Sequence, residues 1–135
     1  MTENKTKVLV VDDNTSFLQL AEMALAGDHN VVTASDGQEG MEKAKNEKPD
    51  IILLDVMMPK VSGLELLRML LADDDTRDIP VIIVTASHFD PSTEMAFKVE
   101  MNVKGFLQKP CPVNTLKEEI ARAMGGGGEP VIGNQ

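Results

Sequence analysis

The sequence predicts an α/β fold, a doubly wound five-stranded parallel sheet with five helices. Two observations predict it. Short, unbroken apolar runs recur along the chain, and segments with helical apolar spacing separate them. Two of these runs, residues 51–54 and 81–84, are apolar throughout, as expected of central strands covered on both faces. Strands and helices that alternate in this way specify a parallel sheet with right-handed crossovers.

Length and composition indicate one globular domain. A chain of 135 residues can form a compact core, and 42% hydrophobic residues is ordinary for a soluble protein. Apolar runs are too short to span a membrane, and residues 1–5 lack the apolar stretch of a signal peptide. The single cysteine, Cys111, cannot form an internal disulfide, so we expect a cytoplasmic location without membrane contact.

The charge balance argues against one class of partner. Thirteen basic and twenty-two acidic residues give a formal charge of -9, whereas binding to a nucleic acid backbone needs a basic surface. Trp and Tyr are absent and there are four Phe, which disfavours a stacking platform for bases. We therefore expect no direct nucleic acid partner, while a cation site is compatible with this charge.

The first β-α unit begins with residues 7–11, a short β-branched strand that stops at Asp12-Asp13. Helical spacing follows over residues 15–26, and Gly27 is placed to end that helix. The apolar face of this helix is formed by Phe17, Leu18, Ala21, Ala24 and Leu25. Two acids directly after a buried strand are an unusual feature.

The second unit starts with a shorter strand, residues 31–34, which we expect nearer an edge of the sheet. Asp36 and Glu39 have the spacing of a capping box, which predicts a helix from there to about residue 46. The third strand, residues 51–54, ends at Asp55. Ser62 and Glu65 again have capping-box spacing, before the apolar positions Leu64, Leu67, Met69, Leu70 and Leu71.

The fourth strand, residues 81–84, ends at Thr85, and the sequence Asp90-Pro91 then predicts a helix start. We expect this helix to reach Asn102, in a left-handed conformation that ends it. Its apolar side would be formed by Met95, Ala96, Val99 and Met101. The fifth strand, 105–108, ends at Lys109, and apolar spacing predicts a last helix over 113–124. Glycines then predict a flexible tail or truncated linker over residues 125–135.

Polar side chains follow four of the predicted strands at the point where each ends. The carboxyl ends of parallel strands meet at one edge of the sheet, where ligands bind in such folds. That edge would hold Asp12, Asp13, Asp55, Thr85 and Lys109. Three close carboxylates repel one another unless a cation intervenes, and Mg²⁺ prefers such oxygen ligands. A carboxylate can also act as a nucleophile toward phosphorus, with a lysine and a hydroxyl contacting the phosphoryl oxygens.

Each feature alone also has an ordinary structural explanation. Asp12-Asp13 could cap the first helix, Thr85 could cap a strand end, and Lys109-Pro110 could form a surface turn. All of them at the ends of four separate strands favour a functional site.

The residues at these strand ends, together with their neighbours in the sequence, match the motifs of a known family. The sequences Val11-Asp12-Asp13-Asn14, Leu54-Asp55-Val56-Met57-Met58-Pro59, Ser62-Gly63, Val84-Thr85-Ala86 and Gln108-Lys109-Pro110 resemble the receiver domain of bacterial two-component response regulators, of the chemotaxis-receiver type. The resemblance spans about residues 5–124, so we expect a receiver domain over residues 1–124. It implies the flavodoxin-like strand order 2-1-3-4-5.

The resemblance also implies the roles of the site residues. Asp55 matches the phosphoacceptor, and Thr85 matches the switch hydroxyl. Lys109 matches the lysine that contacts the phosphoryl group, and Phe106 falls at the switch aromatic, without the hydroxyl that is frequent there. The ligands of a Mg²⁺ ion, with Mn²⁺ as a substitute, would be Asp12, Asp13, Asp55 and the backbone carbonyl of Met57.

Several positions depart from the commonest pattern of the family. Ser62 replaces a frequent Asp, and Asn102-Val103 stands where Gly-Ala is usual. Met57 and Ser87 flank the site and should affect water access. We expect Cys111 to be a small buried hydrophobe, with redox sensing as the alternative.

The implied function is a signalling module, and not a turnover enzyme. A histidine kinase or phosphotransfer protein would phosphorylate Asp55, and an unidentified downstream protein or output domain would read the altered surface. The alternative is a pseudo-receiver that binds proteins without phosphorylation. A hydrolase with an Asp nucleophile is disfavoured because Met57 stands where a second Asp is needed, and no glycine-rich loop follows the first strand to bind a dinucleotide.

Overall fold

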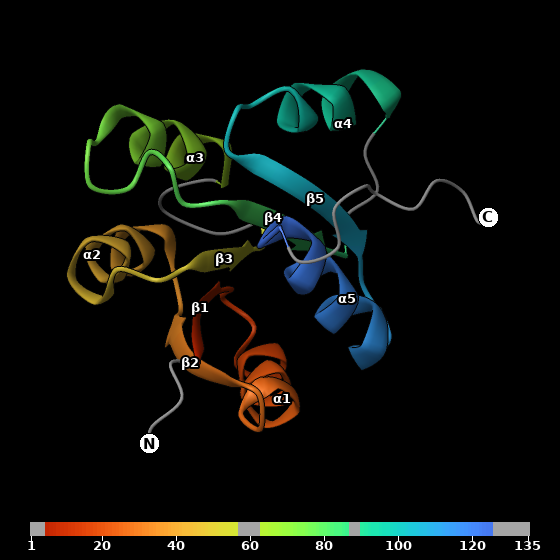
Figure 1. Ribbon diagram of the computed structural model, residues 1–135. Helices are drawn as coiled ribbons and strands as arrows, with labels where there is room; N and C mark the ends of the chain where they lie inside the picture. The colour runs from red at the N-terminus through yellow and green to blue at the C-terminus, as the bar shows by residue number, and fades with distance from the viewer. Residues whose placement is uncertain (1–4, 57–62, 87–89, 126–135) are drawn as a thin grey trace.

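The computed structural model describes residues 5–56, 63–86 and 90–125 of the chain. Over these ranges, five strands alternate with five helices (Figure 1). The strands are β1 (Thr6–Val11), β2 (His29–Ala34), β3 (Ile51–Leu54), β4 (Val81–Thr85) and β5 (Val103–Gln108). The helices are α1 (Thr15–Leu25), α2 (Gly37–Glu47), α3 (Gly63–Ala72), α4 (Pro91–Lys98) and α5 (Val113–Ala123).

The strands form one parallel sheet in the order β2-β1-β3-β4-β5, which confirms the expected fold. The three central strands are almost wholly buried, as their apolar composition predicts. Strand β2 lies at an edge, as expected, but begins two residues earlier than the apolar pattern suggests. Its extra length is stabilised by pairing, since His29 pairs with Thr6 and Asn30 with Lys7.

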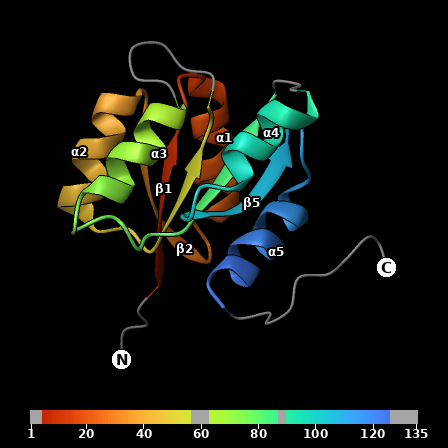
Figure 2. The same ribbon diagram turned by 90° about the horizontal axis from the view of Figure 1, so that it is seen from above.

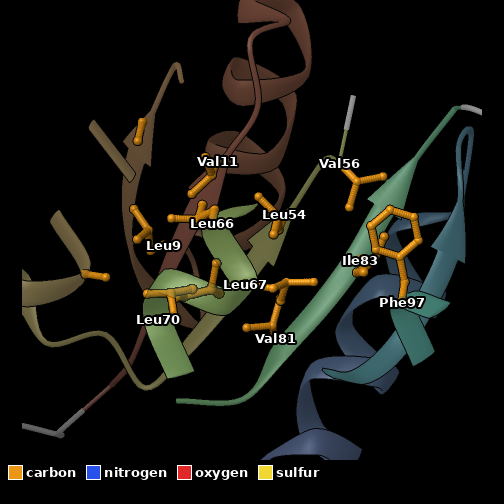
Figure 3. Packing of buried hydrophobic residues seen from close by; sticks show 13 residues of the cluster. Leu9, Val11, Leu54, Val56, Leu66, Leu67, Leu70, Val81, Ile83 and Phe97 are labelled. Carbon is orange, nitrogen blue, oxygen red and sulfur yellow. The ribbon is translucent and has the colours of Figure 1, made fainter. Parts of the chain in front are cut away.

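Helices cover both faces of the sheet, with α1 and α5 on one side and α2, α3 and α4 on the other (Figures 1 and 2). Leu18, Ala21 and Leu25 of α1 pack with α5 against one face. The opposite face carries the second core cluster, to which α3 contributes Leu66, Leu67 and Leu70 (Figure 3). Among the described residues, no helix is both long and apolar enough to cross a membrane.

Helix α4 differs from the prediction in length and in its buried face. It ends at Lys98, and the side chain that enters the core is Phe97 (Figure 3). Met95, Val99 and Met101 are instead exposed, as is Ala96. Helical spacing fits both sets of residues, and the larger apolar ring takes the buried position because it removes more apolar surface from water.

Asn102 was expected to end α4 in a left-handed conformation, and this prediction is wrong. Among the described non-glycine residues only Lys48, at the end of α2, has a positive φ. Asn102 is buried, and its backbone carbonyl accepts a hydrogen bond from the Val81 N–H at 2.8 Å. Its side-chain amide donates to the Leu67 carbonyl at 3.3 Å, so Asn102 joins the start of β5 to α3.

The helix starts follow the capping signals only in part. At α2, the Asp36 carboxylate accepts from the Glu39 N–H at 2.8 Å, as the capping box predicts. The Glu39 carboxylate accepts from the Ser35 N–H, one residue before the expected partner, also at 2.8 Å. The proposed Ser62 cap of α3 lies outside the described residues. Helix α1 ends at Leu25 with Ala26 as its cap, and Gly27 does not adopt the left-handed conformation.

Candidate functional site

The backbone places the site residues at one end of the sheet. Two hydrogen bonds continue the strand pairing past the apolar runs: the Asp12 N–H donates to the Ala34 carbonyl and the Asp55 N–H to the Val11 carbonyl, each at 3.0 Å. The Lys109 N–H similarly donates to the Thr85 carbonyl at 2.9 Å. Each side chain is therefore held by sheet geometry immediately after its strand ends.

Three carboxylates meet there, as the sequence predicts. Asp12, Asp13 and Asp55 each offer an oxygen, and these oxygens lie within 4.8 Å of one another. Asp12 and Asp55 are buried, whereas Asp13 is exposed. Burial raises the pKa of the Asp12 carboxyl group, while hydrogen bonds from Lys109 and the Asn14 N–H act in the opposite direction. Asp12 consequently depends on nearby donors to remain charged.

Lys109 and Thr85 contact the Asp55 carboxylate from two directions. The Thr85 hydroxyl donates to Asp55 Oδ1 at 3.0 Å, and Lys109 Nζ donates to Asp55 Oδ2 at 3.2 Å. Lys109 Nζ also lies 2.5 Å from Asp12 Oδ2, so one ammonium group bridges two of the three acids. With 14% of its side chain exposed, Lys109 is largely withdrawn from water. Ion pairs with this little exposure are weakly screened by salt.

The donor set fits a hard divalent cation. Carboxylate oxygens are the ligands that Mg²⁺ prefers, and the ion usually binds through one or two carboxylates while retaining several waters. The exposed Asp13 leaves one side of the cluster open to solvent, which suits a partly hydrated ion. Met57, whose carbonyl was expected to add a ligand, lies outside the described residues, as does Ser87.

Two residues that the sequence did not assign to the site also take part in its geometry. The Asn14 N–H donates to Asp12 Oδ1 at 2.9 Å, while the Asn14 side chain caps α1 by accepting from the Phe17 N–H at 3.1 Å. Asn at a helix start is a recognisable capping signal. The Phe17 ring contacts Lys109 from a distant part of the sequence, with its centroid 4.1 Å from Nζ. No local pattern in the sequence indicates that contact.

Phe106 and Cys111 are the remaining residues that the sequence singled out near the site. Phe106 is half-buried against the core, and Lys98 Nζ of α4 lies 5.5 Å from its ring centroid. Cys111 is half-buried in a recess of about 300 Å³ that Lys109 and Phe17 also line. Burial raises the pKa of the Cys111 thiol, although the nearby Lys109 charge partly opposes this. The sequence predicted a small buried hydrophobe, whereas the Cys111 side chain is only partly buried.

The sheet order and the acidic cluster at the carboxyl ends of its strands define a class, that of flavodoxin-like α/β domains with a buried aspartate at the strand ends. Residues 8–121 match the family model described as the response regulator receiver domain. The chain belongs to this family of two-component signalling domains.

Relatives agree with that assignment. The protein PilH of Pseudomonas aeruginosa is 35% identical over 121 residues, which cover 89% of this chain and 98% of PilH. Among solved structures, the chemotaxis protein CheY4 of Vibrio cholerae is 30% identical with a TM-score of 0.81, covering 89% of this chain and 99% of that one. The receiver domain of the sensor histidine kinase PA1611 from Pseudomonas aeruginosa has a TM-score of 0.80 at 26% identity, covering 90% of this chain and 99% of its own. That structure holds a magnesium ion in its active-site cleft.

Proposed function

We propose that Asp55 of this receiver domain accepts a phosphoryl group from a histidine kinase or a phosphotransfer protein. One observation carries the proposal: both oxygens of a buried carboxylate are already engaged by groups suited to phosphoryl oxygens. Thr85 contacts one oxygen at 3.0 Å and Lys109 the other at 3.2 Å. A hydroxyl and an ammonium group in these places can donate hydrogen bonds to the negatively charged phosphoryl oxygens once the group is attached to Asp55.

In the reaction, an Asp55 oxygen forms a bond to phosphorus while the bond from phosphorus to the donor's imidazole nitrogen breaks. The imidazole nitrogen keeps the bonding electron pair and takes up a proton from solvent, which returns the donor to neutral histidine. The ammonium of Lys109 exchanges part of its contact with Asp55 for a phosphoryl oxygen. We infer that Asp55 is a phosphoacceptor that later loses its phosphoryl group to water as inorganic phosphate, so the domain acts as a switch and not as a turnover enzyme.

Asp12, Asp13, Asp55 and the Met57 carbonyl would hold a Mg²⁺ ion, for which Mn²⁺ can substitute. When bound, this cation shields the attacking carboxylate and neutralises charge on the phosphoryl oxygens. The spacing of the three carboxylate oxygens, within 4.8 Å, supports the assignment. In the absence of the cation, Lys109 neutralises part of the same cluster through Asp12 and Asp55.

Phosphorylation adds close to two negative charges at the buried end of β3. Thr85 is the hydroxyl that would follow the phosphoryl group, and Phe106 is the aromatic residue whose packing would respond. Phe106 sits on β5 next to α4, so a change there would alter a surface read by a downstream protein or output domain. We assign this cytoplasmic switch to residues 1–124 and treat residues 125–135 as a tail or linker.

Intact mass measured after incubation with phosphoramidate tests the proposal. We expect the wild-type protein to gain one phosphoryl group, roughly 80 Da by covalent arithmetic, only when Mg²⁺ is present. Asp55→Asn should gain none. Asp50→Asn is the matched control, because Asp50 immediately precedes the same strand and its carboxylate accepts from the Lys7 N–H at 2.8 Å. This control should be labelled like the wild type.

An adduct on Asp55→Asn, or labelling of the wild type that does not depend on Mg²⁺, would contradict the assigned chemistry. A folded wild-type protein that gains no mass, under conditions that label another receiver domain, would favour a phosphorylation-independent binding module.

A further inference from the structure

We propose that Phe17 is a positioning residue for phosphoryl transfer, because its ring holds the Lys109 ammonium group against the acceptor carboxylate. The inference rests on the proposed function of Asp55 and adds to it a residue of α1. Lys109 Nζ lies 4.1 Å from the centre of the Phe17 ring, within the range in which a cation is attracted to the negative face of an aromatic ring.

The contact completes the surroundings of the ammonium group. Nζ is bound by Asp12 at 2.5 Å and by Asp55 at 3.2 Å. The Phe17 ring centroid lies 4.1 Å from the same nitrogen, and 14% of the Lys109 side chain is exposed. A lysine side chain has many rotamers and a strongly hydrated head group, so several contacts are needed to hold its ammonium group in one position.

The location of Phe17 is itself fixed by the site. Its N–H donates to the Asn14 side chain, and the Asn14 N–H donates to Asp12, which is the partner of Lys109. The ring is half-buried and packs against the core cluster of α1 and α5. Because the capping bond uses the backbone of residue 17, a change of its side chain leaves the cap intact.

The ring matters most when the carboxylates are taken up by other partners. A cation bound by Asp12, Asp13 and Asp55 competes directly with Lys109 for the same oxygens. The ring competes for none of them, because it carries no formal charge. It therefore keeps Nζ beside Asp55 as the ion pairs exchange, where a phosphoryl oxygen can accept from it.

Rates of phosphorylation test this role. We compare Phe17→Leu, which keeps an apolar side chain but removes the aromatic face, with Phe17→Tyr, which retains it. The donor is phosphoramidate at saturating Mg²⁺. Phe17→Leu should slow adduct formation about three- to tenfold, the effect expected for loss of one partly desolvated cation–ring contact. Phe17→Tyr should react like the wild type, and so should Leu20→Ala, which alters the same recess on the same helix.

A double-mutant cycle separates positioning from general stabilisation of the fold. If Phe17 acts through Lys109, then Phe17→Leu has no further effect on the rate in a Lys109→Met background. An equal slowing in both backgrounds, or an unchanged rate in Phe17→Leu, overturns the proposal. Labelling of the wild type is the check on the proposed function itself, and its failure is distinct from either of these results.

A second measurement needs no phosphorylation. The aromatic ring current of Phe17 should shift the NMR signals of the Lys109 ε-methylene protons upfield in the metal-free protein. The shift should persist in Phe17→Tyr and vanish in Phe17→Leu. If the wild-type signals lie at their ordinary position, the contact is absent in solution and the proposal fails. This measurement on the wild type decides the question if Phe17→Leu does not fold or Lys109→Met has no measurable rate.

Discussion

The Asp12 side chain is buried, yet it has to stay charged if it is to bind a cation. Burial raises its pKa, and the opposing contributions come from Lys109 and from the Asn14 N–H. Removal of one partner from a buried ion pair leaves the other charge uncompensated, which costs about 3–5 kcal/mol in well-buried cases. Lys109 therefore stabilises the fold through Asp12, in addition to its proposed contact with a phosphoryl group.

Cys111 should react slowly with alkylating reagents in the folded protein. The thiolate is the reactive form, and burial raises the pKa of this thiol, so the fraction of thiolate near neutral pH falls below that of a free cysteine. We expect iodoacetamide to modify the native protein more slowly than the urea-unfolded protein at pH 7.5, as followed by intact mass. The native rate should continue to rise with pH beyond the point at which the unfolded rate levels off.

Equal rates in the folded and unfolded protein would contradict this prediction. A faster native rate would instead revive a redox role for Cys111, because a reactive thiol requires a stabilised thiolate.

At the scale of single elements, α3 depends on a close approach between two backbones. A Cβ atom on Gly63 would lie 2.3 Å from Val56 Cα, and the Gly63 N–H donates to the Val56 carbonyl at 3.2 Å. Val56 directly follows Asp55, so this close approach, which a side chain at position 63 would prevent, places the start of α3 beside the site. By contrast, a Cβ on Gly27 would meet nothing within 4 Å.

Gly63→Ala should therefore destabilise the fold, whereas Gly27→Ala should not. The clash in Gly63→Ala involves backbone that cannot rotate away, and we expect a loss of about 2–3 kcal/mol or more in the free energy of unfolding. Gly27→Ala should be neutral or stabilising by up to about 1 kcal/mol, since it reduces the freedom of the unfolded chain. Urea titrations of both variants measure the difference. Similar stability of the two variants would refute the close approach.

Elements with a continuous apolar pattern could be predicted from the sequence, and those with an ambiguous pattern could not. Strands β3 and β4 are apolar at every central position, which leaves one interpretation. In α4, several residues have helical spacing, and tertiary packing selects Phe97 over Met95 or Val99. Asn102 similarly satisfies a long-range bond to Val81, which overrides its local preference for a helix end.

The site could be predicted to the extent that the parallel sheet dictates it. Strand ends gather at one edge, so Asp12, Asp55 and Lys109 follow from topology alone. The ring of Phe17 on α1 reaches Lys109, which follows β5, and only the folded chain brings these two residues together. Contacts between side chains of this kind need coordinates, because no periodicity in the sequence encodes them.

For the whole molecule, the proposed cation site would link metal binding to global stability. A cation that binds the native site and not the unfolded chain stabilises the fold by mass action, by about 2.7 kcal/mol at one hundred times its dissociation constant. Mg²⁺ should therefore raise the melting temperature of the wild type in a concentration-dependent way, measured by calorimetry at constant ionic strength. Removal of the metal with EDTA should reverse the shift.

Asp13→Asn should lose most of that shift, since it removes a carboxylate from the cluster without altering the buried core. Asp50→Asn, which removes a charge outside the cluster, should retain it. An identical response of all three proteins would mean that the stabilisation comes from general ionic effects and not from the proposed site.

The ion pair between Lys109 and Asp12 joins residues that lie 97 positions apart. During synthesis the chain emerges from the ribosome N-terminus first, so Asp12 and Asp55 emerge long before Lys109. Until β5 has been made and docked, the acids cannot assemble with the ammonium group and the Phe17 ring beside it. An unfinished chain therefore lacks the complete set of contacts around Asp55, and on the proposed function it would not yet be a competent phosphoacceptor.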